Sequence, residues 1–294
     1  YGGDTDFHGN VLETVTWAAG PAAHSKNIQV FATVHTAFNH PIVVAKQLAT
    51  LDQLSNGRIG LNVVAGWNKP EYDAFGVDLP SDHSDRYAMA QEWFDYVTRL
   101  WKEDSAFDWD GTFFRGKGVY GQPHPVQARV PIINAAASEE GRAFAMRNAD
   151  FLFTPVFDFG QAQETVEDIK SKALSVERDV EVLTFCTVVC RPTQKEAEDY
   201  LDWYANENAD WDAVNNLMTL QGMHAQSFTK EALAMFRDRF AAGHGGFPLV
   251  GTPDHIADQL EQLSATGVAG TTLSFVDYAK EFPYFRQEVM PRLE

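Results

Sequence analysis

Residues 61–76 read LNVVAGWNKPEYDAFG and join a strand-like apolar run to a glycine and a polar loop. The β-branched residues of LNVVA favour a buried strand, and Asn62 is the polar residue inside it. Gly66 then allows the backbone to turn. The loop after it carries an indole, a carboxylate and a phenol: Trp67, Glu71 and Tyr72. Such a loop at the end of a buried strand is where a scaffold places functional side chains.

Similar short apolar runs recur along the chain and alternate with helix-period segments. The candidate strands are 28–34, 58–65, 130–136, 150–156, 180–189 and 270–276. Alternation of this kind predicts an α/β fold of parallel strands joined by crossover helices, either an open doubly wound sheet or a closed (β/α)8 TIM-type barrel. Six units are too few for a barrel, and helix 11–23 has no strand before it. A barrel would therefore lack its first one or two strand–helix units, about 60–70 residues.

The same pattern of apolar residues, glycines and prolines predicts the helices and two insertions. Segment 41–54 opens with a proline and ends at Asn56-Gly57, and segment 84–101 carries a wide apolar stripe. Two stretches break the pattern, at about 105–127, which is expected to be a hairpin or extended excursion, and at 206–247, which is polar and helical. We interpret both as insertions in a single domain covering residues 1–294.

Composition excludes several classes of protein. The 41 acidic and 23 basic residues give a formal charge of −18, which repels nucleic acid and anionic membranes. The chain has no apolar run long enough to span a membrane and no signal-peptide pattern at its start, so a cytoplasmic protein is expected. Cys186 and Cys190, the two cysteines, have no neighbouring histidine and are predicted to be buried thiols, with no metal site.

One familiar motif is rejected. Residues 116–121, GKGVYG, have the spacing of a dinucleotide-binding loop, but Gln122-Pro123-His124-Pro125 comes next, where that loop requires a helix. P-loop, zinc-protease and serine-hydrolase motifs are absent from the sequence.

Polar residues instead gather after strands, where barrels place their chemistry. Thr33 and His35 close the first strand, Asn62 lies in the second, Arg86 and Tyr87 begin a helix, and Ser138 follows the third strand. Together they suggest a ligand that bears a phosphate. Each also has a structural explanation: Ser138 as an N-cap, Arg86 as an exposed charge paired with Asp82 or Asp85, and Asn62 as a partner for a backbone group.

Three segments carry a resemblance to a known family: LDQLSNGRIGLNVVAGWNKPEYDAFG, DHSDRYAMAQEWFDYVTRLW and NAAASEEGRAFAMRNADFLFT. They resemble the bacterial luciferase-like flavin-dependent monooxygenases, and among these the pyrimidine oxygenase, dimethyl sulfone and nitrilotriacetate monooxygenase branch. The similarity runs from Tyr1 to about Thr154 and returns in LVGTPDHIADQL.

The resemblance implies a (β/α)8 barrel that binds reduced FMN and activates dioxygen. Positions that match flavin-binding residues are Asn62, Glu71, Arg86, Tyr87 and Ser138, with Arg86 and Ser138 at the phosphate. Thr33 and Asn62 match a pair that holds oxygen beside flavin N5 and favours an adduct there over one at C4a. They are the expected catalytic residues.

The resemblance also implies the partners. An NAD(P)H-dependent flavin reductase would supply reduced FMN, the chain would form a homo-oligomer, and a small organic molecule such as a heterocycle, sulfone or amine would be oxygenated. Two alternatives stay open: a deazaflavin-dependent (F420) oxidoreductase of the same superfamily, and a flavin-binding protein without turnover. The Thr33 and Asn62 pair favours the monooxygenase.

Overall fold

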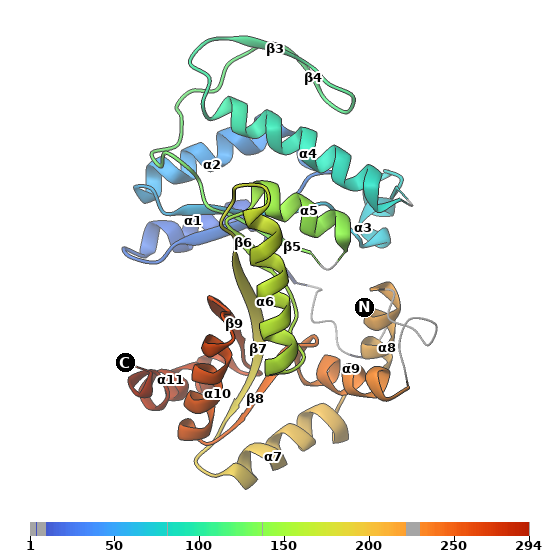
Figure 1. The fold of residues 1–294 in the computed structure, drawn as a ribbon, viewed down its shortest axis with the longest axis vertical. Helices are drawn as coiled ribbons and strands as arrows, with labels where there is room; N and C mark the ends of the chain where they lie inside the picture. The colour runs from blue at the N-terminus through green and yellow to red at the C-terminus, as the bar shows by residue number, and fades with distance from the viewer. Residues whose placement is uncertain (1–3, 5–9, 81, 137, 222–229, 294) are drawn as a thin grey trace. The chain divides into compact units, whose positions relative to one another are not determined.

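The computed structural model describes residues 4, 10–80, 82–136, 138–221 and 230–293. They group into two compact units (Figure 1): a first unit of residues 11–152 and 178–180, and a second unit of residues 1–10, 153–177 and 181–294. No helix in the described part of the chain is long and apolar enough to cross a membrane. The single barrel domain expected from the sequence stays a prediction.

The first unit is built from parallel strands and crossover helices. Its elements are α1 (Thr14–His24), β1 (Val30–His35), α2 (Pro41–Ser55), β2 (Ile59–Val64), α3 (Lys69–Phe75), α4 (His83–Leu100), β3 (Phe107–Asp110), β4 (Arg115–Val119), β5 (Ile132–Ala135) and α5 (Glu139–Asn148). Strand β6 (Phe151–Phe153) comes next, at the boundary between the units. Strand β2 pairs in parallel with both β1 and β5, so the three strands end at one edge.

The two faces of these strands differ in burial. Val34 and Val63 are register partners on a buried face, and helices α1, α2 and α5 contact β1, β2 and β5 respectively. Thr33 and Asn62 are register partners on the opposite, less buried face. The alternation of strand side chains therefore places apolar residues toward the helices and the candidate site residues on the other side.

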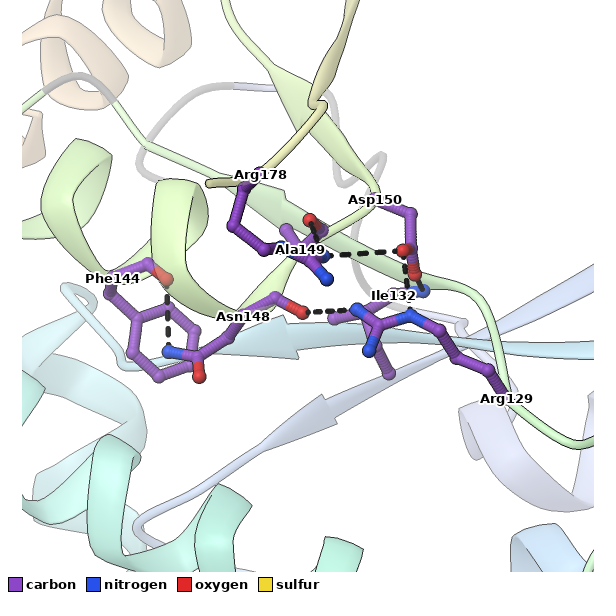
Figure 2. A network of polar contacts seen from close by, with 7 residues as sticks. All are labelled: Arg129, Ile132, Phe144, Asn148, Ala149, Asp150 and Arg178. Atoms are coloured by element: carbon purple, nitrogen blue, oxygen red, sulfur yellow. Dashed lines mark hydrogen bonds and ion pairs between the residues drawn. The ribbon is translucent and has the colours of Figure 1, made fainter. Parts of the chain in front are cut away.

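A polar network fixes the start of β5, as Figure 2 shows. The carboxylate of Asp150 accepts from Nε of Arg129 at 2.8 Å and from the backbone N–H of Ile132 at 2.9 Å. Arg178 donates to the carbonyl of Ala149 at 2.9 Å and lies 3.4 Å from the same carboxylate. Because Ile132 is the first residue of β5, the network holds this strand in register beside β2.

The excursion at about 105–127 is the antiparallel hairpin β3–β4, as the sequence predicts. Glu92 of α4 closes it: its carboxylate accepts from the backbone N–H groups of Thr112, Phe113 and Phe114 and from the indole of Trp109. GKGVYG lies on β4 and the two residues directly after this strand, and the chain leads from there to β5 and not into a helix.

The second unit repeats the parallel pattern. Its elements are α6 (Phe159–Leu174), β7 (Glu181–Cys190), α7 (Gln194–Asp202), a π-helical turn (Trp203–Glu207), α8 (Trp211–Leu220), α9 (Lys230–Gly243), β8 (Phe247–Gly251), α10 (Pro253–Ala265), β9 (Gly270–Ser274), α11 (Tyr278–Glu288) and a 3-10 turn (Met290–Arg292). Strand β7 pairs in parallel with both β8 and β9. Cys186 and Cys190 are buried free thiols, as predicted, and burial raises the pKa of each to about 11.

The α/β class with mostly parallel strands is confirmed, and two elements correct the sequence reading. The loop expected after Gly66 contains helix α3, and β8 begins at Phe247, where an insertion was expected to end. Both elements are short, and Pro248 lies within β8, where a proline is unusual. Segment 206–247 is helical in α8 and α9, but residues 222–229 lie outside the described part.

Candidate functional site

Two polar side chains meet on the less buried face of the first unit. Nδ2 of Asn62 on β2 donates to Oγ1 of Thr33 on β1 at 3.2 Å. This bond uses an acceptor site of the Thr33 hydroxyl and leaves its proton available. Oδ1 of Asn62 is buried and has no hydrogen-bond partner in the described structure. Within the described structure the pair therefore presents the Thr33 proton as a donor and Oδ1 of Asn62 as an unpaired buried acceptor, which favours a ligand that can donate to it.

His35 lies two residues after Thr33 on the same face of β1. Its ring stacks on Phe38 with centroids 4.2 Å apart and meets Tyr72 edge-on at 5.3 Å. Burial lowers the pKa of His35 to about 4, because the charged imidazolium would lose its hydration there. His35 is consequently neutral at pH 7 and adds no positive charge to the site.

Arg86 contacts the turn that follows β2. Its side chain is 8% exposed, and Nη1 donates to the carbonyl of Gly66 at 2.9 Å. The alternative of an exposed charge paired with Asp82 or Asp85 is therefore wrong. Nε of Arg86 is buried and unpaired among the described residues, so the guanidinium keeps donor capacity for another acceptor.

Tyr87 and Ser138 come together at the start of α5. Ser138 is the N-cap, and its Oγ accepts from the N–H of Gly141 at 3.2 Å. A Cβ built on Gly141 would lie 2.4 Å from the hydroxyl oxygen of Tyr87, so this hydroxyl lies against the first turn of α5. The free N–H groups of a helix start attract anions. Glu139 and Glu140 in the same turn oppose that attraction.

The structure does not bring all the predicted residues into one cluster. Glu71 is exposed on the first turn of α3, and no described contact joins it to Asn62, Arg86 or Ser138. Trp67 is also exposed. Sequence reasoning named Tyr72 only as a loop residue, yet it is 1% exposed, and its hydroxyl donates to the carbonyl of Ala65 at 3.1 Å. Pro70 in the first turn and Gly76 as the C-cap are signals for the helix around it, whereas the burial of Tyr72 comes from the packing of its ring on His35 and Phe38.

Known proteins are similar in sequence to this chain over nearly its whole length. The chain is 31% identical over 290 residues to the FMNH(2)-dependent dimethylsulfone monooxygenase of Pseudomonas fluorescens, covering 95% of this chain and 77% of that protein. It is 31% identical over 300 residues to the pyrimidine monooxygenase RutA of Acinetobacter baylyi, covering 99% and 80% respectively. These are two of the proteins that the sequence was expected to resemble.

A solved structure supports the fold. DmoA from Hyphomicrobium sulfonivorans superimposes with a TM-score of 0.84 at 22% identity, covering 96% of this chain and 71% of that one. The model of the family described as luciferase-like monooxygenase matches residues 3–270. The chain belongs to the luciferase-like monooxygenase family.

Proposed function

We propose that this chain is the oxygenase of a two-component monooxygenase, which binds reduced FMN made by a separate NAD(P)H-dependent reductase and oxygenates a small organic molecule. The observation that carries the proposal is the Thr33–Asn62 pair, whose buried Oδ1 is left without a donor among the described residues. The two relatives described above are named as monooxygenases, one of them as FMNH2-dependent. A heterocycle, a sulfone and an amine are the substrate classes to test.

The pair suits the two demands of this chemistry. Reduced flavin supplies the electrons that activate dioxygen, while the protein orients the reactants and excludes water. Oδ1 of Asn62 accepts an N–H such as the one at N5 of a reduced flavin. The hydroxyl of Thr33 keeps its proton to donate to an oxygen atom held beside that edge.

The other residues suit the remainder of the cofactor. The unpaired Nε of Arg86, the hydroxyl of Tyr87 and the start of α5 at Ser138 are donors for a phosphate. Because Nη1 of Arg86 is already bonded to Gly66, the phosphate would be met by the rest of the guanidinium. Glu71 is proposed to contact the cofactor from α3.

Anaerobic titration with two reduced cofactors tests the proposal. A 5-deazaflavin carries carbon in place of N5, so it offers Asn62 no N–H at that position. We expect reduced FMN to bind at least about tenfold more tightly than the reduced deazaflavin, the factor for one well-placed buried hydrogen bond. Equal or tighter binding of the deazaflavin contradicts the proposal and favours a hydride-transfer enzyme.

Turnover separates an enzyme from a carrier. With reduced FMN, dioxygen and the three substrate classes, we expect dioxygen-derived oxygen in a product detected by mass spectrometry. Tight binding of reduced FMN without such a product in any class would favour a flavin-binding protein.

A further inference from the structure

We infer that Tyr72 is a positioning residue, which fixes the Ala65–Gly66 turn and through it the end of β2 that carries Asn62. The inference deepens the proposed function and rests on it for its catalytic consequence. Its structural part stands on contacts within the first unit.

Two helices hold consecutive carbonyls of this turn. The hydroxyl of Tyr72, on α3, donates to the carbonyl of Ala65 at 3.1 Å. Nη1 of Arg86, on α4, donates to the carbonyl of Gly66 at 2.9 Å. These carbonyls come directly after the last residue of β2, Val64, so side chains replace the ladder bonds that a longer strand would make. The turn is thereby bonded to two helices instead of being left to solvent.

The side chains of His35 and Tyr72 also pack against the turn at Gly66. Gly66 has φ +102°, in the region that favours glycine, and a Cβ there would lie 2.3 Å from Nε2 of His35 and 2.4 Å from Oη of Tyr72. The backbone therefore lies against both rings. His35 and Tyr72 in turn pack on Phe38. The hydroxyl of Tyr72 thus bonds a turn whose other sides are closed by Arg86 and His35.

Motion of this turn would reach Asn62 along the strand. The carbonyl of Val64 accepts from the N–H of Thr36, which ties the end of β2 to β1 at 3.0 Å. Asn62 lies two residues before Val64 and bonds Thr33 across the same pair of strands. If the turn becomes more mobile, the pairing of β1 and β2 should open first at this end. The hydrogen bond from the Asn62 carboxamide to Thr33 would then break more often. Substrate oxygenation would then compete less well with the unproductive reaction of reduced flavin with oxygen.

Tyr72→Phe and Tyr96→Phe form a matched test in the full chain. Both tyrosines are fully buried in the first unit, and each change removes one hydroxyl while keeping the ring. The Tyr96 hydroxyl lies against the hairpin at Gly116 and bonds no described residue. Tyr96→Phe therefore shows what loss of a buried hydroxyl does by itself.

Two measurements decide the inference. In Tyr72→Phe, the amides of Thr36 and residues 62–66 should exchange hydrogen about fivefold faster than in the parent chain, which is the factor for one neutral hydrogen bond. In Tyr96→Phe, the exchange rates of the same amides should stay within about twofold of the parent chain. In turnover, Tyr72→Phe should lower the product formed per reduced FMN consumed, and Tyr96→Phe should not.

Unchanged exchange at these amides in Tyr72→Phe would overturn the inference. Faster exchange with an unchanged product yield would also overturn it, because the hydroxyl would then serve only to satisfy a buried carbonyl. If the parent chain formed no product with any substrate class, the proposed function would fail. The exchange measurement would still decide whether Tyr72 fixes the turn.

Discussion

His35 is the ionisable residue closest along β1 to the Thr33–Asn62 pair, and its environment determines its charge. The imidazole stacks on Phe38, and Nε2 is buried without a hydrogen-bond partner in the described part of the chain. A neutral imidazole fits these apolar neighbours, whereas an imidazolium would lose its hydration without gaining a bond.

The stability of the protein should therefore depend on pH through His35. The folded pKa, about 4, lies below the ordinary value of 6.5, so the unfolded chain takes up the proton first as pH falls. The stabilisation is complete above pH 6.5 and is lost as pH falls through about 4. The free energy of unfolding in urea, measured for the parent chain and for His35→Phe between pH 6.5 and about 4, checks this prediction, because the variant lacks the titrating group. Parallel pH curves for the two proteins would contradict the assignment.

Comparing Gly66 with Gly76 separates the energetic cost of backbone strain from the cost of steric crowding. Both have positive φ, +102° and +66°, but a Cβ on Gly66 meets His35 and Tyr72, whereas nothing lies within 4 Å of one on Gly76. Gly76→Ala should cost about 1 kcal/mol of unfolding free energy from strain alone, and Gly66→Ala about 2–4 kcal/mol. Denaturant unfolding measures both. Equal losses would show that the turn has room for a side chain.

Sequence reasoning at this scale found the residue types but not all their contacts. Asn62 and Thr33 could be placed because a strand pattern sets which side chains share a face. The bond from Arg86 to Gly66 could not be predicted, since it joins residues twenty positions apart on two different elements and a local pattern does not show how these pack. The alternative of Arg86 as an exposed charge paired with Asp82 or Asp85 was wrong for that reason.

At the scale of the element, the hairpin β3–β4 depends on one carboxylate from a helix. Glu92 accepts from three successive backbone N–H groups of the turn, from Thr112 to Phe114, and from the indole of Trp109. Partial burial raises the pKa of Glu92, but these donors together outweigh it and lower the pKa below its ordinary value.

Glu92→Gln should therefore destabilise the protein in a pH-dependent way. The carboxylate contributes above its ordinary pKa, and the contribution is lost as pH falls through the lowered folded value. At pH 7 we expect a loss of about 1–2 kcal/mol, since an amide nitrogen cannot accept from the turn. The difference in unfolding free energy between the parent chain and Glu92→Gln should become smaller as pH falls below the ordinary pKa of a glutamate. If this difference stayed constant over the same range, the charge of Glu92 would not stabilise the hairpin.

The elements themselves were largely predictable. Strands and helices with a clear period, such as β2 and α4, appear within a residue or two of the predicted bounds, because burial of one face determines both pattern and structure. Helix α3 was missed because it is short, and strand β8 because it is short and contains Pro248. Such elements are stabilised by tertiary packing that a local pattern does not contain.

At the scale of the molecule, the parallel strands establish the α/β fold, and the sequence matches establish the family. Strands β1, β2 and β5 end together, and β1 and β2 carry Thr33 and Asn62, two of the residues that the family resemblance singled out. The substrate could not be predicted, because the contacts that select it depend on side chains that only the folded chain assembles. The proposed chemistry depends most on Asn62, whose buried Oδ1 has no hydrogen-bond partner among the described residues.

Transfer of oxygen from ¹⁸O2 to product in Asn62→Ala tests the central claim most directly. Asn134→Ala is the matched control, since Asn134 lies on adjacent β5 but on the opposite face, beside Val63, whose carbonyl its Nδ2 bonds at 2.8 Å. With reduced FMN and an accepted substrate, we predict that Asn62→Ala remains folded and loses labelled product about 10- to 100-fold. Asn134→Ala should lose stability and keep its yield per folded molecule. An unchanged yield of labelled product in Asn62→Ala would contradict the role proposed for this residue.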